Sequence, residues 1–154
     1  MTKILSFFLL LVITYSCSER RNKNNNSEYL DNQSRPVIET FFNNIGDGKI
    51  DIALENLLSR NENIDLQDSA TINLKNKFET IYKYSGKFIG KKLIRQKNLN
   101  DDLGIYVYLV KFEKKFYRFI FTFYNNGTQT KIYKFSFDDT IDSELEESIK
   151  LYIN

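Results

Sequence analysis

Three stretches in the second half of the chain decide its fold: "GIYVYLVKFE" (residues 104–113), "FYRFIFTFY" (116–124) and "KIYKFSFDD" (131–139). All three are rich in aromatic and β-branched residues, which is typical of β-strands. The stretch before them, "KFIGKKLIRQK" (87–97), predicts a less regular strand in which Gly90 marks a bulge. We therefore expect an antiparallel sheet of about four strands.

The two central strands can be aligned if Lys114 and Lys115 form a two-residue turn. One face of the pair then carries facing apolar residues: Val110 with Phe119, Tyr108 with Phe121, and Tyr106 with Phe123. The other face pairs Leu109 with Ile120, and Lys111 with Arg118. The like charges of that second pair oppose each other, so we expect this part of the face to be in water.

The next turn contains Asn126 and Gly127, which are a strong hairpin signal. A strict two-residue loop there would place a lysine within the aromatic face. One additional residue restores the aromatic face through two pairs, Phe119 with Phe135 and Phe121 with Tyr133. We therefore expect a three-residue loop with a bulge at Gly127.

Apolar residues at helical spacing predict three helices before the sheet. The first begins with Ser34 as its N-cap and Pro36 in its first turn, and Gly46 ends it. The second covers residues 50–58 and the third covers 69–84. Their apolar faces contain these residues: Val37, Ile38, Phe41, Phe42 and Ile45; Ile50, Ala53, Leu54, Leu57 and Leu58; Leu74, Phe78, Ile81 and Tyr82.

The end of the chain, "DSELEESIKLYI" (142–153), predicts a short C-terminal helix. Ser143 and Glu146 form an S-x-x-E capping box, and Leu145 and Ile149 lie on its apolar side. The expected fold class is therefore α+β, with N-terminal helices packed on a curved antiparallel sheet of about four strands and a short C-terminal helix.

This order of elements resembles the nuclear transport factor 2-like fold. "VIETFFNNIGDGKIDIALENLLS" (37–59) is similar to its entry helices, and "FETIYKYSGKFIGKKLI" (78–94) to its third helix and first long strand. The resemblance covers residues 36–137; the final helix departs from it. It implies a cone in which helices lie against the concave face of the sheet, and many exported bacterial members are small lipoproteins.

The N-terminus has the parts of a bacterial export signal: Lys3, an apolar run over residues 4–13, and "LLLVITYSCSER" (9–20), which holds the sole cysteine, Cys17. The run is too short to span a bilayer, which needs about 20 residues. The pattern resembles a lipoprotein signal, in which the cysteine after a small residue, here Ser16, is acylated. We expect lipidation of Cys17, with palmitate among the acyl groups, and localisation in the bacterial cell envelope, with the outer membrane favoured.

These expectations divide the chain into three parts. Residues 1–16 are a signal peptide, residues 17–34 are the lipidated cysteine and an Asn-rich flexible tether, and residues 35–154 are the nuclear transport factor 2-like domain. The tether is polar and cannot bury enough apolar surface to offset the entropy lost on ordering.

The composition of the chain limits which partners and which catalytic or metal-binding residues can be expected. The 154 residues include 22 basic and 20 acidic ones, for a net charge of +2, which gives no reason to expect nucleic acid as a partner. Histidine is absent, so the usual general base and the commonest metal ligand are missing. Since Cys17 belongs to the signal and tether, a cysteine nucleophile is excluded as well. We assign no catalytic, cofactor-binding or metal-binding residue.

Three groups of side chains have both a structural and a functional interpretation, and the structural one is favoured for each. Inner-face tyrosines are either core or ligand donors: Tyr106, Tyr108, Tyr117 and Tyr133. Acids near the C-terminus either favour a helix N-terminus or bind Ca²⁺: Asp138, Asp139, Asp142, Glu144, Glu146 and Glu147. Cations of the first strand either guard a sheet edge or contact anionic lipid headgroups: Lys87, Lys91, Lys92, Arg95 and Lys97.

The leading hypothesis is a non-enzymatic, lipid-anchored envelope protein that binds a homodimer partner or another envelope protein. An outer sheet face would carry that role: Ile105, Val107, Leu109, Ile120 and Ile132. The alternative is a small-molecule binder or weak enzyme with a polar pocket among Tyr82, Tyr108, Phe121 and Tyr133. A third hypothesis is an assembly factor for an envelope complex.

Overall fold

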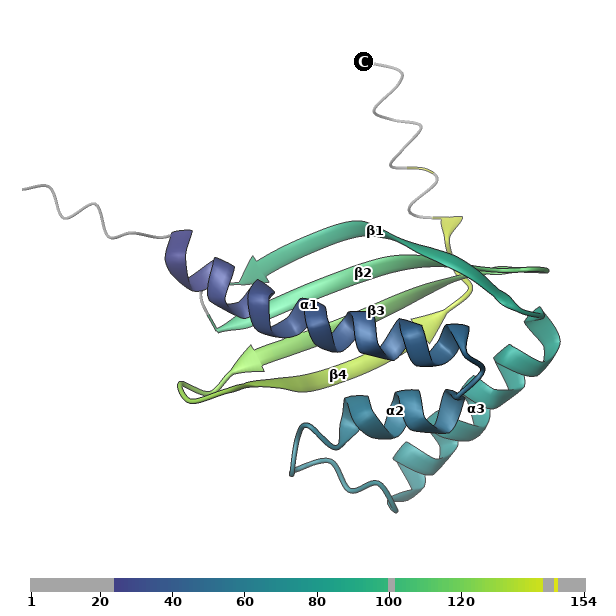
Figure 1. Cartoon of the computed structure of the whole chain (residues 1–154), viewed down its shortest axis with the longest axis horizontal. Helices are drawn as coiled ribbons and strands as arrows, with labels where there is room; N and C mark the ends of the chain where they lie inside the picture. The colour runs from purple at the N-terminus through teal and green to yellow at the C-terminus, as the bar shows by residue number, and fades with distance from the viewer. Residues whose placement is uncertain (1–23, 100–101, 143–145, 147–154) are drawn as a thin grey trace, which may run out of the picture.

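A computed structural model describes residues 24–99, 102–142 and 146 (Figure 1). Three helices, α1 (Asn24–Gly46), α2 (Ile50–Leu58) and α3 (Ser69–Ser85), precede four strands. The strands are β1 (Phe88–Leu99), β2 (Leu103–Phe112), β3 (Phe116–Asn125) and β4 (Thr130–Asp138), and they form an antiparallel sheet in the order β1-β2-β3-β4. This confirms the α+β fold class with helices packed on a four-stranded sheet. The expected C-terminal helix lies almost wholly outside the described residues.

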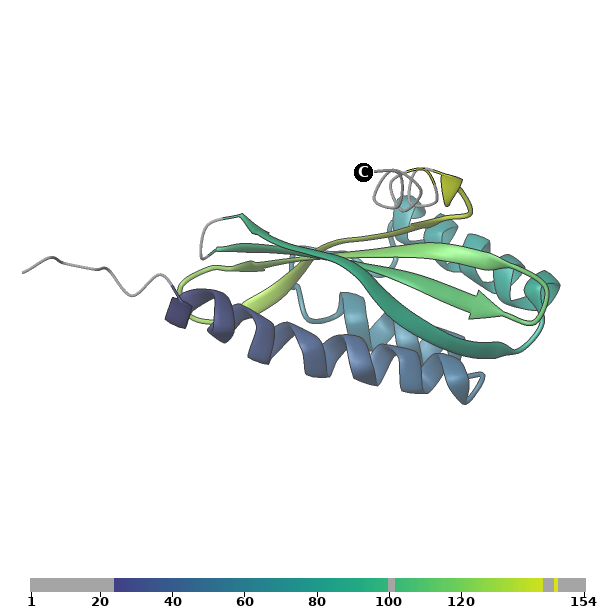
Figure 2. The same cartoon turned by 90° about the horizontal axis from the view of Figure 1, so that it is seen from above.

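Helix α1 crosses one face of the sheet, and Figure 2 shows it beneath the strands along most of their length. Its residues Val37, Ile38, Phe41, Phe42 and Ile45 are all buried, as their helical spacing predicts. Helix α2 packs beside α1, and its buried residues are Ala53, Leu54, Leu57 and Leu58. The core therefore lies between one face of the sheet, called here the inner face, and the three helices.

Helix α1 begins earlier than expected, at Asn24, so the prediction of a flexible tether is wrong for residues 24–34. Ser34 is no N-cap, and Pro36 lies inside the helix. Leu30 and Ser34 are both completely buried, and they extend the buried face of α1 by two further turns. The backbone of β2 approaches so closely that a Cβ on Gly104 would lie 2.8 Å from Leu30 Cδ2. The folded domain therefore includes residues 24–34 as part of α1, and the burial of Leu30 offsets part of the cost of ordering them.

The predicted β2–β3 register is wrong by two residues, because the turn consists of Glu113 and Lys114. Tyr108 lies opposite Phe119 and Tyr106 opposite Phe121, so the inner face keeps its aromatic composition. The junction of α3 and β1 holds the turn through three hydrogen bonds: Glu113 N to Lys87 O (3.0 Å), Lys114 N to Ser85 O (3.0 Å), and Lys87 N to the Glu113 carboxylate (3.0 Å). The shift also avoids the like-charged pair, since Lys111 now faces Phe116.

The bulge between β3 and β4 lies at Tyr133, and the prediction of a bulge at Gly127 is wrong. Phe123 faces Ile132 and Thr122 faces Lys134, so Tyr133 is the additional residue. The loop has four residues, 126–129, and Asn126 Oδ1 accepts the backbone N–H groups of Thr128 (3.1 Å) and Gln129 (2.9 Å). The bulge turns Ile132 into the core, although we expected it on the outer face. The expected irregularity near Gly90 is confirmed, because Ile89 has no partner on β2.

The burial of Leu30 generates a test of where the domain begins. Leu30→Ala should lower the free energy of unfolding by about 2–5 kcal/mol, because it removes a fully buried side chain from the core. Asn32→Ala, at an exposed position of the same helix, is the matched control and should change stability little. Urea denaturation of both variants measures the difference. If Leu30→Ala cost no more than its control, residues 24–34 would be a tether after all.

Candidate functional site

The space between α1 and the inner face is filled by aromatic rings. Phe41 and Phe42 of α1 contact the sheet, with ring centroids 5.3 Å apart for Phe41 and Phe121 and 5.2 Å apart for Phe42 and Tyr108. Phe121 contacts Phe135 at 5.0 Å, and Phe78 of α3 contacts Phe137 at 5.2 Å. These contacts occupy the region in which a cone pocket would lie.

The tyrosines proposed as pocket donors do not converge. Tyr106, Tyr108 and Tyr117 are buried on the inner face, but the bulge leaves Tyr133 65% exposed. Tyr117 and Ser85 share a buried hydrogen bond of 2.8 Å. Tyr82 packs edge-on against Phe112 and is half-buried. The described side chains therefore give little support to a polar cone pocket.

One polar network joins the first half of α1 to the sheet. Asp31 Oδ1 accepts hydrogen bonds from Tyr106 Oη (2.6 Å) and Gln96 Nε2 (2.6 Å), and Asp31 Oδ2 accepts one from Arg35 Nε (3.2 Å). Arg35 Nη2 also donates to Gln96 Oε1 at 2.7 Å. The network fixes α1 against β1 and β2. Sequence reasoning missed it because residues 24–34 were assigned to the tether.

Two pKa shifts follow from this geometry. Burial by itself would raise the pKa of Asp31, but the hydrogen bonds from Tyr106, Gln96 and Arg35 outweigh it, so the pKa lies below its usual value. Burial, and then the hydrogen bond to Asp31, raise the pKa of Tyr106. Tyr106 therefore stays protonated and donates to an ionised Asp31 near neutral pH, which is a charge-assisted hydrogen bond with a structural role.

The lowered pKa of Asp31 makes its contribution to stability depend on pH. That contribution is complete above the pKa of the unfolded carboxyl, about 3.9, and is lost as the pH falls through the folded pKa. Tyr106→Phe should therefore cost about 1–2 kcal/mol near pH 7, and the cost should shrink below about pH 4. Denaturant titrations at several pH values measure it.

Tyr108→Phe is the matched control, since the hydroxyl of Tyr108 forms no hydrogen bond with the described residues. A cost for Tyr106→Phe that equals this control, or that stays constant with pH, would contradict the assigned network.

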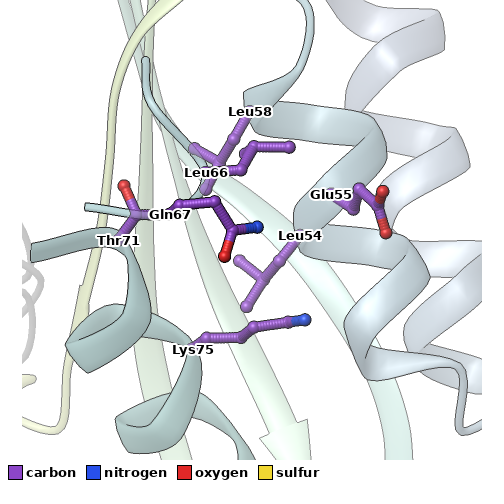
Figure 3. A pocket seen from close by; sticks show the side chains of 7 residues that line it. All are labelled: Leu54, Glu55, Leu58, Leu66, Gln67, Thr71 and Lys75. Carbon is purple, nitrogen blue, oxygen red and sulfur yellow. The ribbon is translucent and has the colours of Figure 1, made fainter. Parts of the chain in front are cut away.

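A hollow of about 100 Å³ lies between α2, α3 and the loop that joins them. In Figure 3 the side chains of Gln67 and Lys75 extend into the space between the two helices, with Leu54, Leu58 and Leu66 at its base. Drug-sized ligands need roughly 300–1,000 Å³. One of its polar side chains is also engaged elsewhere, because Lys75 pairs with Asp51 at 3.2 Å. This hollow is a packing groove without a catalytic arrangement.

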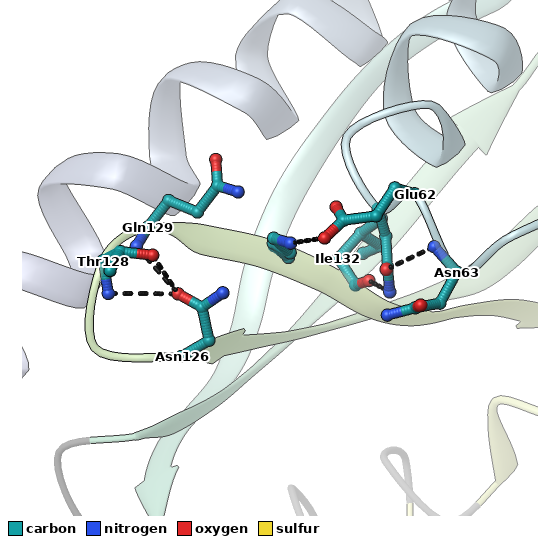
Figure 4. A network of polar contacts seen from close by, with 8 residues as sticks. Glu62, Asn63, Asn126, Thr128, Gln129 and Ile132 are labelled. Atoms are coloured by element: carbon teal, nitrogen blue, oxygen red, sulfur yellow. Dashed lines mark hydrogen bonds and ion pairs between the residues drawn. The ribbon is translucent and has the colours of Figure 1, made fainter.

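A second group of polar contacts ties the α2–α3 loop to β4 (Figure 4). Lys131, which is 3% exposed, forms an ion pair with Glu62, and Asn61 Nδ2 donates to the carbonyl oxygen of Ile132 at 2.8 Å. Asn61 Oδ1 accepts the backbone N–H of Asn63 at 3.1 Å. These contacts hold the α2–α3 loop against β4, and no periodic signal in the sequence points to them.

The opposite face of the sheet, called here the outer face, has a different composition. Residues that face each other on antiparallel strands point to the same side, so the register defines rows across the sheet. Three rows form its central part: Lys97, Ile105, Thr122 and Lys134; Arg95, Val107, Ile120 and Ser136; Lys92, Leu109, Arg118 and Asp138. Each row begins with a cation on β1 and continues with an apolar residue on β2.

An apolar strip therefore runs along the middle of the outer face: Ile105, Val107, Leu109 and Ile120. Val107 is buried but lies outside the core cluster, and the other three are half-buried. Four exposed side chains, the cationic border, flank the strip: Lys92, Arg95 and Lys97 on β1, and Lys134 on β4. Leu99, Phe116 and Tyr133 are large, exposed apolar side chains that extend the strip. None of the described helices covers this face (Figure 2).

Lys91 differs from the other cations of β1, because it points to the inner side. Its ammonium pairs with Glu39 of α1 and lies 4.7 Å from the centre of the Phe42 ring. The sequence alone does not distinguish it from the other cations of this strand. Because successive side chains of β1 point to opposite faces, Lys91 lies between α1 and the sheet while Lys92 lies on the outer face.

The described C-terminal acids are in part engaged by cations. Asp138 accepts a hydrogen bond from Arg118 at 3.1 Å, and Asp139 pairs with Lys115. Within residues 24–99, 102–142 and 146, no group of three or more potential ligands is placed to hold a metal ion. Helices in the same ranges include none that is both long and apolar enough to cross a membrane. Cys17 lies outside the described residues.

Comparison with known proteins gives no relative: no protein-family model, no curated protein and no solved structure matches this chain. The likeness to the nuclear transport factor 2-like fold therefore stays a prediction that rests on the order of the elements and on the motifs of the sequence.

Proposed function

We propose that this chain is a non-enzymatic, lipid-anchored protein of the bacterial cell envelope that acts through the outer face of its sheet. The contrast between the two faces supports the proposal. Aromatic rings fill the inner side, whereas the outer face presents an apolar strip with a cationic border. Apolar surface rimmed by charge is typical of an interaction site.

The chemistry of the side chains favours binding over catalysis. The chain has no histidine, and its single cysteine belongs to the N-terminal signal. The half-buried acid Asp31 is held ionised by three donors, and the tyrosine beside it has a raised pKa, so neither is suited to proton transfer near neutral pH. The nuclear transport factor 2-like assignment is part of the proposal and agrees with helices that cover one face of an antiparallel sheet.

Lipidation of Cys17 explains why the only thiol follows an apolar run of export-signal length. Acyl chains contribute about 0.8 kcal/mol per buried CH₂ group, and two or more chains give a stable anchor. Cleavage before Cys17 would leave six residues, 18–23, between the anchor and the first residue of α1.

The anchor is tested by intact mass and membrane partitioning of the native protein and of Cys17→Ala. The native chain should begin at residue 17, carry added acyl mass and remain with the membrane fraction. The variant should lose both the acyl mass and cleavage before residue 17. Native protein that is cleaved elsewhere and keeps a free thiol would overturn the proposal.

A second copy of the chain is the alternative occupant of the outer face. Face-to-face pairing would bring together two cationic borders, and the described strands offer only Asp138 as an opposing acid. This charge distribution opposes self-association. We therefore expect a monomer in detergent solution over the micromolar range, as measured by sedimentation velocity.

The control for this prediction is Ile120→Glu, which places a carboxylate in the centre of the apolar strip. Wild type and variant should sediment alike. A wild-type dimer that dissociates when Ile120 is replaced would show that a second copy covers the face, and it would contradict the argument from charge.

A further inference from the structure

The charges of the sheet are distributed unequally between its two sides. The four strands carry eight basic residues and one acidic residue. Lys91 and Lys131 pair with Glu39 and Glu62 of the helical layer, and Arg118 lies opposite Asp138. The other five cations of the strands are on the outer face: Lys92, Arg95, Lys97, Lys111 and Lys134. The outer face is therefore strongly positive, although the chain as a whole has a net charge of only +2.

The arrangement of these cations matches an interface with a lipid surface. Within the described residues, no carboxylate pairs with Lys92, Lys97 or Lys134, and all three are exposed. They flank the apolar strip on two sides, so their ammonium groups can reach headgroup phosphates while their alkyl stems lie beside Ile105 and Leu109. Exposed Tyr133, Phe116 and Leu99 add the side-chain types that favour the membrane–water boundary.

The early start of α1 limits how far the domain can be from an anchored Cys17. Asn24 is seven positions after Cys17 along the chain, which is a reach of at most about 25 Å, whereas the expected tether of residues 17–34 would have allowed roughly 60 Å. A strand of twelve residues such as β1 is itself about 40 Å long. The domain therefore stays within its own length of the bilayer, which raises the effective concentration of headgroups around it.

The anchored end of the domain is also the end at which the cationic border begins. In Figure 1 the first turn of α1 lies at the end of the sheet at which β1 ends and β4 starts, on the side of β1. Lys97 is two residues from the end of β1, and Lys134 is four residues into β4. Both lysines are in the row that also contains Ile105 and Thr122. Of the three rows of the outer face, this one is nearest to the proposed anchor.

We propose that the partner of the outer face is the anionic lipid surface of the membrane that holds the anchor, so that the sheet lies on the headgroups and the helical layer faces away. This inference rests on the proposed lipid anchor and names the partner of the same face. Each cation close to an anionic surface increases association roughly fivefold, and the apolar strip adds a contribution that does not depend on salt.

The test uses the native lipidated chain in vesicles. The native cysteine is blocked by its acyl group, so a cysteine introduced elsewhere is the one thiol that a fluorophore can label. Thr122→Cys places the fluorophore on the outer face, and Asn43→Cys places it on the exposed side of α1 as a control.

Vesicles of phosphatidylglycerol with phosphatidylethanolamine, or of phosphatidylcholine alone, contain a quencher in the lipid headgroup region. The probe at position 122 should be quenched only on the anionic vesicles, and salt of about 1 M should relieve the quenching. The probe at position 43 should stay unquenched on both.

A charge variant makes the same test quantitative. Lys92→Gln, Lys97→Gln and Lys134→Gln together should shift the equilibrium away from the docked state on the order of 100-fold. Lys49→Gln, Lys75→Gln and Lys83→Gln in the helical layer remove the same charge and should have little effect.

Two results would overturn the inference. One is an anchored protein whose probe at position 122 is unquenched on anionic vesicles; the other is burial of that probe in a protein dimer. Loss of the anchor itself is recognised separately, because the chain then lacks acyl mass and does not remain with either type of vesicle.

Discussion

The contact between α1 and the aromatic inner face is the interaction on which the rest of the structure depends. Phe41 alone lies within 5.2–6.3 Å of the rings of Phe78, Phe119, Phe121 and Phe135. Its helix therefore connects the third helix to two strands of the sheet. Burying a Phe side chain is worth roughly 1.5–3 kcal/mol, so this cluster supplies a large share of the stability of a small domain.

Because aromatic rings fill the space between α1 and the inner face, the outer face is the part of the sheet that is left for binding. Because side chains alternate along a strand, a sheet that points its rings inward must present its other residues to the outside. In this chain those residues are Ile105, Val107 and Leu109 on β2, Ile120 at the centre of β3, and lysine or arginine on β1. Lysines on an edge strand also discourage pairing with another sheet, and that role is compatible with lipid binding. The cations and the apolar strip together make the outer face the best candidate for a binding surface.

Much of the fold could be predicted from the sequence. Helices α2 and α3 and all four strands were expected within a few residues of their observed bounds, because each has a clear apolar period and ends at a glycine or a polar loop. The inner faces of β2 and β3 were also predicted, since a register shift of two residues leaves each side chain on its face. Asp68 caps α3 by accepting the Thr71 N–H, in agreement with the predicted start.

Other features depend on contacts that no local pattern reveals. The start of α1 was misplaced because Ser34 and Pro36 imitate a helix N-terminus, whereas the burial of Leu30 and the Asp31–Tyr106 hydrogen bond depend on residues about 75 positions later. The bulge at Tyr133 is favoured by the four-residue loop and by the burial of Ile132. For the candidate site, four of the five apolar residues expected on the outer face lie there, and Ile132 does not.

The central claim is that the outer face, and not the helical layer, is the surface at which this protein works. Photo-crosslinking in living cells tests it most directly, with a photoreactive residue in place of Thr122 on the outer face or of Asn56 on α2. We predict phospholipid adducts of the chain from position 122 and none from position 56, as read by mass spectrometry. Adducts from position 56 alone would contradict the account and would place the working surface on the helical layer.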